Sequence, residues 1–274
     1  MQSLLDRQRL AAAPDEPGVY RFLAADGAVL YVGKAKRLRR RLAAYRTVAL
    51  RSRRKRDRRI TAILRAAAGC EWETTASHLD ACLLELRLIQ QLRPRFNVSA
   101  SFSRSYPFIA TRCAAGRLYV AFSSRPERLA GYAAFGAFRS REVTAAAFYG
   151  LLALLQFVGH KEKARAGAHG FRQIPTAWHA ELHAFFAGTS CALLQTLTLS
   201  LLERAAARTR RAEVQEHLAA LRRFWDVEAE PLRRAIRDTG YRGAYPVPQL
   251  ERDPLFTRWR LAGESASTPP SRLV

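Results

Sequence analysis

The chain has 274 residues, of which 49% are hydrophobic and 25% charged, a balance that allows a sizeable buried core and excludes an intrinsically disordered protein. The formal net charge is +23, and residues 1–60 alone contribute +12 with 17 Lys/Arg against 5 Asp/Glu. Such a field attracts polyanions, so nucleic acid is the expected partner and an anionic membrane surface is the alternative.

The sequence has few of the features that are typical of a membrane-spanning, secreted or metal-rich protein. The longest apolar stretch, Phe148–Val158, is too short to span a bilayer, so we expect no membrane association. The N-terminal segment mixes charged residues and proline, which argues against a secretory signal and for the cytoplasm. No C-x-x-C pair occurs, so neither a zinc site nor a disulfide framework is expected from the four cysteines, Cys70, Cys82, Cys113 and Cys191.

After a short helical lead, the chain opens with two β-rich runs. GVYRFLA and AVLYVG flank a turn at Asp26-Gly27, which predicts an antiparallel hairpin. The sequence then predicts a helix from Lys34 to about Tyr45, with apolar residues on one face and basic residues around the rest.

Three further elements complete the first hundred residues. The strongly basic segment 46–59 leads into a predicted helix over 60–68, and CEWETTAS predicts a third strand. The clearest amphipathic helix, Leu79–Leu92, follows and stops at Pro94. The order β-β-α-α-β-α indicates a small α+β domain over residues 1–100, an antiparallel three-stranded sheet with flanking helices.

The rest of the chain is expected to be mainly helical. Residues 101–140 predict a β-hairpin that acts as a connector, and residues 241–274, rich in proline and serine, predict an irregular tail. Between them lies a predicted helical region, 141–240, with helices over Arg141–Val158, Thr176–Ala187, Cys191–Arg223 and Glu228–Asp238.

Several polar residues of the first domain could carry chemistry. Tyr20 and Tyr31 lie on the hairpin, close to the ammonium of Lys34; a phenol, whose pKa is about 10, needs such a cation to act as a base at neutral pH. Arg41 lies two helical turns after Lys34, a spacing that suits a phosphate clamp. Glu85 interrupts an apolar helix pattern and could hold one Mg²⁺ or Mn²⁺.

Each of these residues has an alternative interpretation. The tyrosines could be ordinary strand aromatics, and Lys34 and Arg41 could belong to a solvated basic helix. Glu85 could be a salt-bridged residue at the helix edge, and Asn97 a simple turn residue. His179 and His183, spaced i and i+4, fit a helix surface better than a metal site because no acidic third ligand accompanies them.

The ordered motifs nevertheless match a known family. Gly18-Val19-Tyr20 and Tyr31-Val32-Gly33 resemble the two signature triplets of GIY-YIG nucleases, with Val in place of Ile. The following KAKRL, with Arg41 and Tyr45, resembles the UvrC subgroup, as does LLELRLIQQLRPRFNV with Glu85 and Asn97. The resemblance continues through SYPFI, and four ordered blocks over about ninety residues are specific.

The resemblance implies a metal-dependent DNA endonuclease that makes a single-strand incision by phosphodiester hydrolysis in nucleotide-excision-type repair. One Mg²⁺ or Mn²⁺ ion on Glu85 would stabilise charge at the scissile phosphate. Tyr31 would be the general base for water, Tyr20 and Lys34 would polarise it, and Arg41 would stabilise the phosphate. The supporting residues would be Gly33, Tyr45 and Asn97, and the residues that bind DNA would be Lys36, Arg37, Arg40, Arg53, Arg54 and Lys55.

The second half departs from the UvrC pattern. YAAFGAF is similar to the family's segment, but the cysteine cluster that follows in UvrC is missing, so no iron–sulfur cluster is expected. The Phe-Glu signature of the UvrB-binding region is also missing, which weakens a UvrB-like helicase as partner beside damaged double-stranded DNA. The layout resembles the short Cho-like homologues. The alternative function is a non-catalytic DNA-binding or docking module of a repair assembly.

Overall fold

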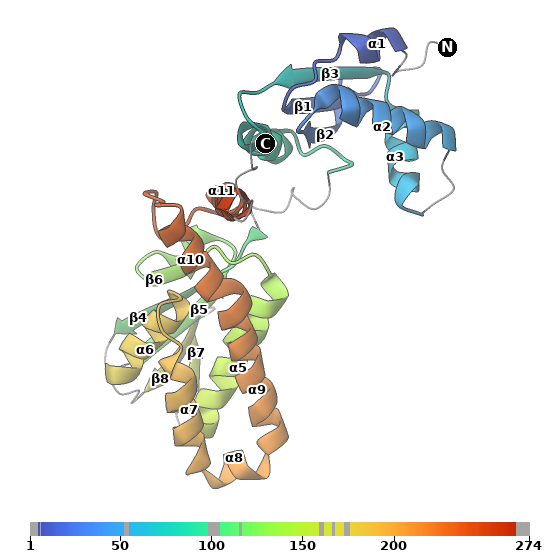
Figure 1. Ribbon diagram of the computed structural model, residues 1–274. Coiled ribbons are helices and arrows are strands. Elements are labelled where there is room, and N and C mark those ends of the chain that lie inside the picture. The colour runs from blue at the N-terminus through green and yellow to red at the C-terminus, as the bar shows by residue number, and fades with distance from the viewer. Residues whose placement is uncertain are drawn as a thin grey trace, which may run out of the picture. The chain divides into compact units, whose positions relative to one another are not determined.

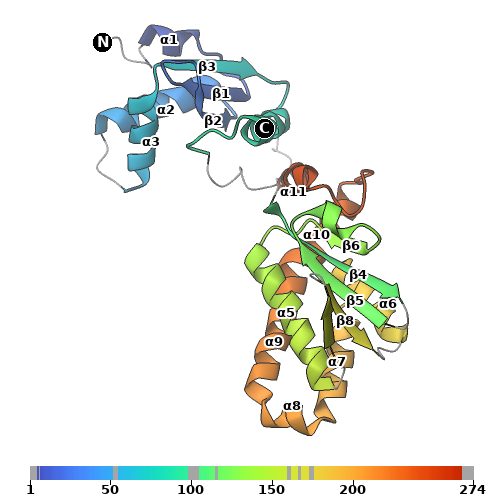
Figure 2. The same ribbon diagram turned by 180° about the vertical axis from the view of Figure 1, so that it is seen from behind.

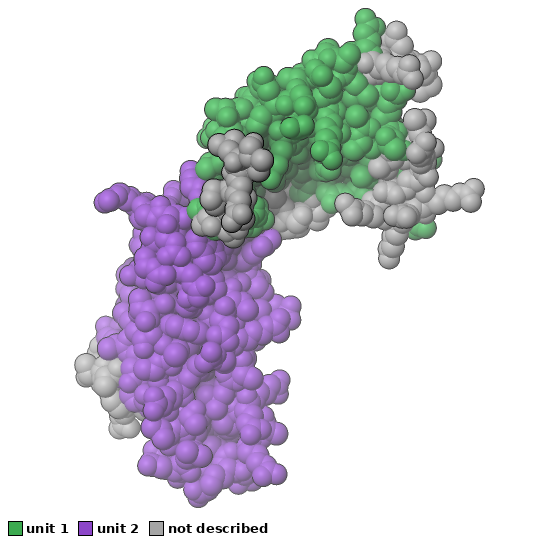
Figure 3. Space-filling view, viewed as in Figure 1, with its two compact units in different colours: residues 1–103, 260–274 green, residues 104–259 purple. Residues whose placement is uncertain are grey.

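The protein divides into two compact units (Figure 3). The computed structural model describes residues 5, 7–51, 55–97, 105–114, 117–158, 162–165, 168–172 and 176–266. Unit 1 comprises residues 1–103 and 260–274, and unit 2 comprises residues 104–259.

Unit 1 is built on a three-stranded antiparallel sheet. Its strands are β1 (Gly18–Leu23), β2 (Val29–Ala35) and β3 (Gly69–Thr74), in the order β2-β1-β3. Gly27, with φ of 84°, makes the turn between β1 and β2, a conformation that favours glycine. The predicted hairpin and three-stranded sheet are therefore confirmed.

Helices cover both faces of this sheet, as Figure 1 shows. Tyr20 and Phe22 of β1 pack against Leu38 and Leu42 of α2 in one cluster, whereas Val19 of β1 belongs to a second cluster with α4. Alternate strand residues thus enter opposite cores. The helices of this unit are α1 (Arg7–Ala12), α2 (Leu38–Arg51), α3 (Lys55–Ala66) and α4 (His78–Leu92).

The ends of α4 follow from its sequence. The Ser77 side chain accepts a hydrogen bond from the Asp80 N–H at 3.1 Å and so caps the first turn. At the other end Arg93 adopts a left-handed conformation with φ of 46°, and Pro94 cannot continue the helix. These two caps set the ends of α4, the helix that carries Glu85.

Lys34 is not on a helix, contrary to the prediction. It pairs with Val19 in the ladder between β1 and β2, and α2 begins only at Leu38. Strand pairing with β1 outweighs the local helical pattern here. The predicted two-turn helical spacing between Lys34 and Arg41 is therefore wrong, and any common target must be reached from a strand and a helix.

Unit 2 contains a five-stranded antiparallel sheet in the order β6-β4-β5-β8-β7. The predicted hairpin is present as β4 (Phe108–Ala114) and β5 (Arg117–Ser123), which run side by side in Figures 1 and 2 and form the centre of the sheet. The outer strands are β6 (Ala133–Gly136), β7 (Glu162–Arg165) and β8 (Ala168–Arg172).

The C-terminal region is mostly helical, as predicted, but two of these strands, β7 and β8, interrupt the helices expected over 141–240. β7 and β8 consist mainly of Ala, Gly, Lys, Arg and His, which carry no β-strand signal of their own. β8 is a strand because it pairs with β5, from Arg117 opposite Arg172 to Ala121 opposite Ala168. Tertiary pairing of this kind leaves no local pattern in the sequence.

The helices of unit 2 also differ from the prediction at two places. The expected helix Cys191–Arg223 breaks near Arg204 and Arg210, whose backbones leave the helical region, so that α7 and α9 each contact α5. The expected irregular tail contains α11, whose buried Leu255 anchors it despite three nearby prolines. The elements are η2 (Pro126–Leu129), α5 (Arg141–Val158), α6 (Thr176–Phe186), α7 (Ala192–Leu202), α8 (Ala205–Thr209), α9 (Arg211–Phe224), η3 (Trp225–Ala229), α10 (Glu230–Asp238) and α11 (Gln249–Ala266).

Helix α5 forms the centre of the unit 2 core. Within the described part of the chain it is the one helix whose length and composition would allow it to cross a membrane. Ten of its residues are buried, among them Phe148, Leu151 and Leu155, which belong to the same hydrophobic cluster as residues of α6, α7 and α9. Its apolar character is thus explained by packing inside the unit.

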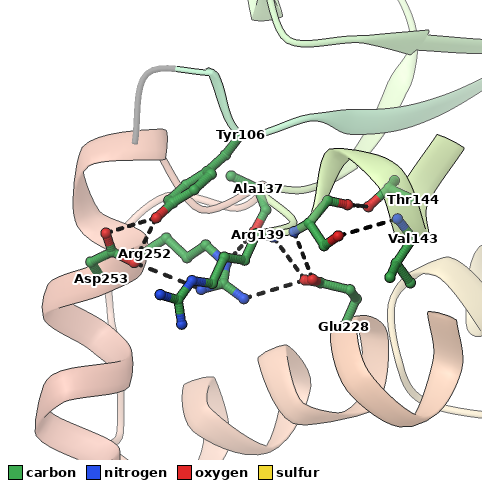
Figure 4. Close-up of polar contacts among 9 residues, drawn as sticks. Tyr106, Ala137, Arg139, Val143, Thr144, Glu228, Arg252 and Asp253 are labelled. Atoms are coloured by element: carbon green, nitrogen blue, oxygen red, sulfur yellow. Dashed lines mark hydrogen bonds and ion pairs between the residues drawn. The ribbon is translucent and has the colours of Figure 1, made fainter. Parts of the chain in front are cut away.

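A buried ion pair ties α11 to the start of α5 (Figure 4). Arg252 donates to Glu228 at 3.3 Å and to the Ala137 carbonyl at 2.9 Å, and both charged side chains are only 4% exposed. Glu228 also accepts hydrogen bonds from the backbone N–H groups of Arg139 and Ser140, at 2.7 and 2.8 Å. The carboxylate therefore satisfies amides just before the N-terminus of α5, where negative charge is stabilising.

Candidate active site

Three hydroxyl-bearing rings of unit 1 meet beneath α2. The hydroxyl groups of Tyr20 and Tyr45 are 2.8 Å apart, and the Arg41 Nε donates to the Tyr20 oxygen at 3.3 Å. Tyr31 completes the cluster, its ring 6.2 Å from that of Tyr20. The Tyr20 and Tyr45 side chains are buried, whereas Tyr31 is half-buried and Arg41 is exposed.

In this arrangement the Tyr20 phenol stays neutral and the Arg41 guanidinium stays positively charged. Burial raises the pKa of Tyr20, and the neighbouring Tyr45 and Tyr31 raise it further. Burial lowers the pKa of Arg41, but interactions with Tyr20, Tyr45 and Tyr31 outweigh it and raise the pKa overall. Arg41 is thus permanently positively charged, and its exposed side chain lies beside the phenol cluster.

The glycine of the second triplet is required by close packing. A Cβ atom at Gly33 would lie 2.4 Å from the Tyr20 hydroxyl oxygen and 2.9 Å from a ring carbon of Tyr31. Any side chain there would displace both rings. Gly18 of the first triplet is similarly confined, because its Cβ would lie 2.3 Å from the Glu73 carbonyl oxygen.

Tyr31 is the member of the cluster that is partly open to solvent. Burial raises its pKa, as do Tyr45 and the negative charge of Glu85, while Arg41 lowers it. The Arg59 guanidinium lies 5.9 Å from the centre of the Tyr31 ring and also donates to the Phe96 carbonyl. Glu85 and Arg41 therefore act on the pKa of Tyr31 in opposite directions.

Glu85 reaches the site from α4. Its carboxylate pairs with the Lys34 ammonium and accepts a hydrogen bond from the Lys34 backbone N–H at 3.1 Å. The Glu85 side chain is 13% exposed and that of Lys34 33%, so the pair lies at the surface edge of the sheet. Both residues predicted for this site are thus in contact, although Lys34 reaches it from β2.

Asn97 holds the strand that carries Tyr31. Its side-chain amide donates to the Val32 carbonyl at 2.8 Å, and its side-chain oxygen accepts from the Val32 N–H, also at 2.8 Å. Phe96 donates from its N–H to the Leu30 carbonyl at 3.1 Å. The segment after α4 therefore satisfies the free edge of β2 on both sides of Tyr31.

The oxygen donors of the site fit one hard divalent ion. Mg²⁺ commonly uses one or two carboxylates and completes its shell with water and phosphate oxygens, and Glu85 is a carboxylate of this kind. Among the described residues no group of three or more His, Cys, Asp or Glu side chains could form a complete protein cage. The site suits an ion shared between Glu85, water and a phosphate.

The predicted DNA-binding residues lie only partly within the described structure. Lys36, Arg37 and Arg40 are exposed around the start of α2, and Arg37 faces Asp15 at 3.7 Å. Arg53 and Arg54 lie outside the described residues, as does the side chain of Lys55. Sequence reasoning did not single out Arg59 as a site residue; its place at the end of the basic run 51–59 was the available signal.

The two histidines of α6 contact β4. His183 is hydrogen-bonded to the Thr111 hydroxyl at 2.6 Å, and His179 lies 3.0 Å from the Cys113 sulfur. Burial lowers the pKa of His183, and the neighbouring His179 lowers it further. These contacts explain their i, i+4 spacing as packing of α6 on the sheet.

Comparison with known proteins matches unit 1. The model of the UvrC-like GIY-YIG domain matches residues 16–98. The UvrABC system protein C of Rhizobium etli is 45% identical over 96 residues, which are 35% of this chain and 13% of that protein. The protein of the same description from Salinibacter ruber is 39% identical over 105 residues, 38% of this chain and 16% of that protein.

A solved structure covers the same part of the chain. The GIY-YIG N-terminal endonuclease domain of UvrC from Thermotoga maritima, described as bound to its catalytic divalent cation, magnesium, is 35% identical, with a TM-score of 0.30. The match covers 36% of this chain and all of that one. The present chain spans less than a fifth of the length of the two UvrABC system proteins C named above.

The sheet order, the triplets packed around Tyr20 and the family match together define the class: residues 16–98 form a GIY-YIG domain. Within that class, the domain belongs to the UvrC-like group.

Proposed function

We propose that the protein is a DNA endonuclease that cuts one strand of damaged double-stranded DNA by phosphodiester hydrolysis, in cytoplasmic nucleotide-excision-type repair. The observation that carries the proposal is the phenol cluster of Tyr20, Tyr31 and Tyr45 with Arg41 bonded to it, and Glu85 held by Lys34 on the strand that carries Tyr31. The UvrC-like relatives support DNA repair as the setting.

Tyr31 is the residue best placed to take a proton from the attacking water. It is half-buried, so a water molecule can reach it, whereas Tyr20 and Tyr45 are enclosed. Because its pKa is raised, its hydroxyl is neutral at neutral pH and must lose its own proton to act as a full base. Arg41, which lowers that pKa, favours this loss.

Arg41 is the proposed phosphate ligand. Its Nε is held by the Tyr20 hydroxyl, so the outer nitrogens of the exposed guanidinium remain to bind phosphate oxygens in a fixed orientation. Tyr20 and Tyr45 are positioning residues, because they act through Arg41 and Tyr31 and are too buried to touch DNA. Lys36, Arg37 and Arg40 would contact the flanking backbone without sequence preference.

Glu85 is the proposed ligand of one Mg²⁺ or Mn²⁺. When bound, such an ion supplies positive charge that stabilises the phosphate and the leaving oxygen in the transition state. Lys34 holds the Glu85 carboxylate in place by two contacts, from its backbone N–H and its ammonium. Asn97 keeps β2, and with it Tyr31, at a constant distance from α4.

Nicking of supercoiled plasmid tests the proposal. The wild-type protein should convert it to the open-circular form with Mg²⁺ or Mn²⁺ and not with EDTA. Glu85→Ala should abolish nicking, whereas Glu71→Ala, which removes an exposed carboxylate of β3, should leave it unchanged. DNA binding without cleavage in any metal would instead establish the non-catalytic module. A UvrB-like helicase remains the proposed partner, to be tested by co-purification.

A further inference from the structure

The sheet of unit 2 has two chemically different faces. On one face, Phe135 packs 5.8 Å from Phe186 of α6, and Phe122 stacks 5.5 Å from Phe148 of α5. Because side chains alternate along a strand, the intervening positions lie on the opposite face, away from these helices. Leu129 of η2 covers only one end of that face, over Ala110 and Ala121.

The other end of this face carries an arginine held between two aromatic rings. The Arg112 guanidinium lies 4.7 Å from the centre of the Tyr132 ring and 5.5 Å from that of Tyr119, its partner across the ladder. Arg112 is exposed and both tyrosines are half-buried. Stacking on tyrosine fixes the plane of the guanidinium while its N–H groups stay available to an anion.

The strand register places a second arginine on this face. Arg117 lies two residues before Tyr119 on β5, so its side chain leaves the strand on the same side. Within β4, β5 and β6 no position is Asp or Glu, and no ion pair among the described residues joins Arg112 or Arg117 to a carboxylate.

We propose that this basic sheet face, defined by Arg112, Arg117, Tyr119 and Tyr132, binds the phosphate backbone of double-stranded DNA. The proposal rests on the proposed function for its choice of DNA, and adds a second contact in unit 2. Positive charge on described strands that hold no carboxylate complements a polyphosphate.

The contacts favour a duplex over an unpaired strand. Proteins that bind single strands offer open aromatic rings on which bases stack. Here the rings of Tyr119 and Tyr132 are already covered by Arg112. What remains available is the charge of Arg112 and Arg117, which suits the regular phosphates of a duplex and reads no sequence.

Fluorescence anisotropy with the full chain in EDTA tests this, because binding is then separated from cleavage. For an undamaged labelled duplex, each phosphate that an arginine no longer neutralises should make the slope of log affinity against log salt less steep by about 0.9. The double variant Arg112→Ala/Arg117→Ala should therefore have a slope that is less steep by about 1.8, and it should bind the duplex severalfold more weakly. The matched control is Arg223→Ala, an exposed arginine of α9, which should bind as the wild type does.

Three results would overturn the proposal: an unchanged slope in the double variant, a loss of affinity confined to a single-stranded probe, or equal competition by polyglutamate. Thermal unfolding of each variant establishes that the fold is intact, and Arg112→Lys/Arg117→Lys, which keeps the charge, should retain most of the slope. If the wild type binds DNA but never cuts it, the proposed nuclease function fails and this inference stands. If it cuts DNA and the double variant binds normally, this inference alone fails.

Discussion

The ammonium of Lys34 pairs with the carboxylate of Glu85, so the strand that carries the second triplet is joined to α4 at the proposed metal ligand. The same carboxylate oxygen cannot fully serve a cation of the protein and a metal ion at once. Lys34 therefore positions Glu85 and also competes with the metal ion for its carboxylate. Replacing Lys34 should consequently change metal affinity and cleavage rate in different directions.

Replacing Lys34 with methionine tests that competition. Lys34→Met should lower the Mn²⁺ concentration that gives half-maximal cleavage, because the Glu85 carboxylate is freed, while the maximal rate falls through loss of positioning. Changes at residues that orient a metal ligand typically alter metal affinity by about 10- to 100-fold. A metal titration of cleavage measures both quantities, and a raised half-maximal concentration would exclude competition.

The pH dependence of cleavage tests Tyr31 as the base. Its pKa is raised by burial, by Tyr45 and by Glu85, so the phenolate is a minor form at neutral pH and increases with pH. Below that pKa, the single-turnover rate should rise about tenfold per pH unit. Tyr31→Phe should be slow and lose this slope; a flat wild-type profile would show that another group takes the proton.

Asn97→Ala should destabilise unit 1 because it leaves both polar groups of Val32 without the side-chain partner they have now. Each buried group left unsatisfied costs about 1–3 kcal/mol, so the free energy of unfolding should fall by about 2 kcal/mol or more. Asn97→Asp, which keeps an acceptor for the Val32 N–H, should lose less. Urea denaturation measures the difference; equal losses would argue against the paired geometry.

The buried pair of unit 2 predicts a much larger effect. Glu228→Ala leaves Arg252 charged and only 4% exposed, in surroundings where burial already lowers its pKa, and should cost about 3–5 kcal/mol of unfolding free energy. Glu230→Ala removes a more exposed carboxylate, paired with Arg234, and should cost less than about 1 kcal/mol. Similar losses in the two variants would contradict the role given to Glu228.

The sequence predicted the parts of unit 1 whose signals are local. A D-G turn between β-rich runs, the end of α4 before Pro94 and the spacing of the two triplets all depend on neighbouring residues. The sequence predicted that Lys34 and Glu85 belong to one site, but not that they are in contact. It placed Lys34 on a helix, whereas the ladder with β1 keeps Lys34 in a strand.

Unit 2 was less accessible to sequence reasoning because its elements depend on distant partners. β8 pairs with β5 across about fifty residues, and Arg252 of α11 meets Glu228 of η3 and the Ala137 carbonyl. Neither relationship has a periodic pattern. The basic sheet face was missed for the same reason, since Arg112, Tyr119 and Tyr132 come together only when β4, β5 and the segment before β6 are aligned.

The most direct test of the account is the rate of the cutting step, measured in a single turnover with saturating protein and an end-labelled duplex, for the wild type, Tyr31→Phe and Glu85→Gln. We expect both variants to bind the duplex within about threefold of the wild type and to cut it at least about 100-fold more slowly, the lower end of a general-base contribution. Cutting by either variant at the wild-type rate would contradict the convergence of Tyr31, Arg41 and Glu85 on one phosphate.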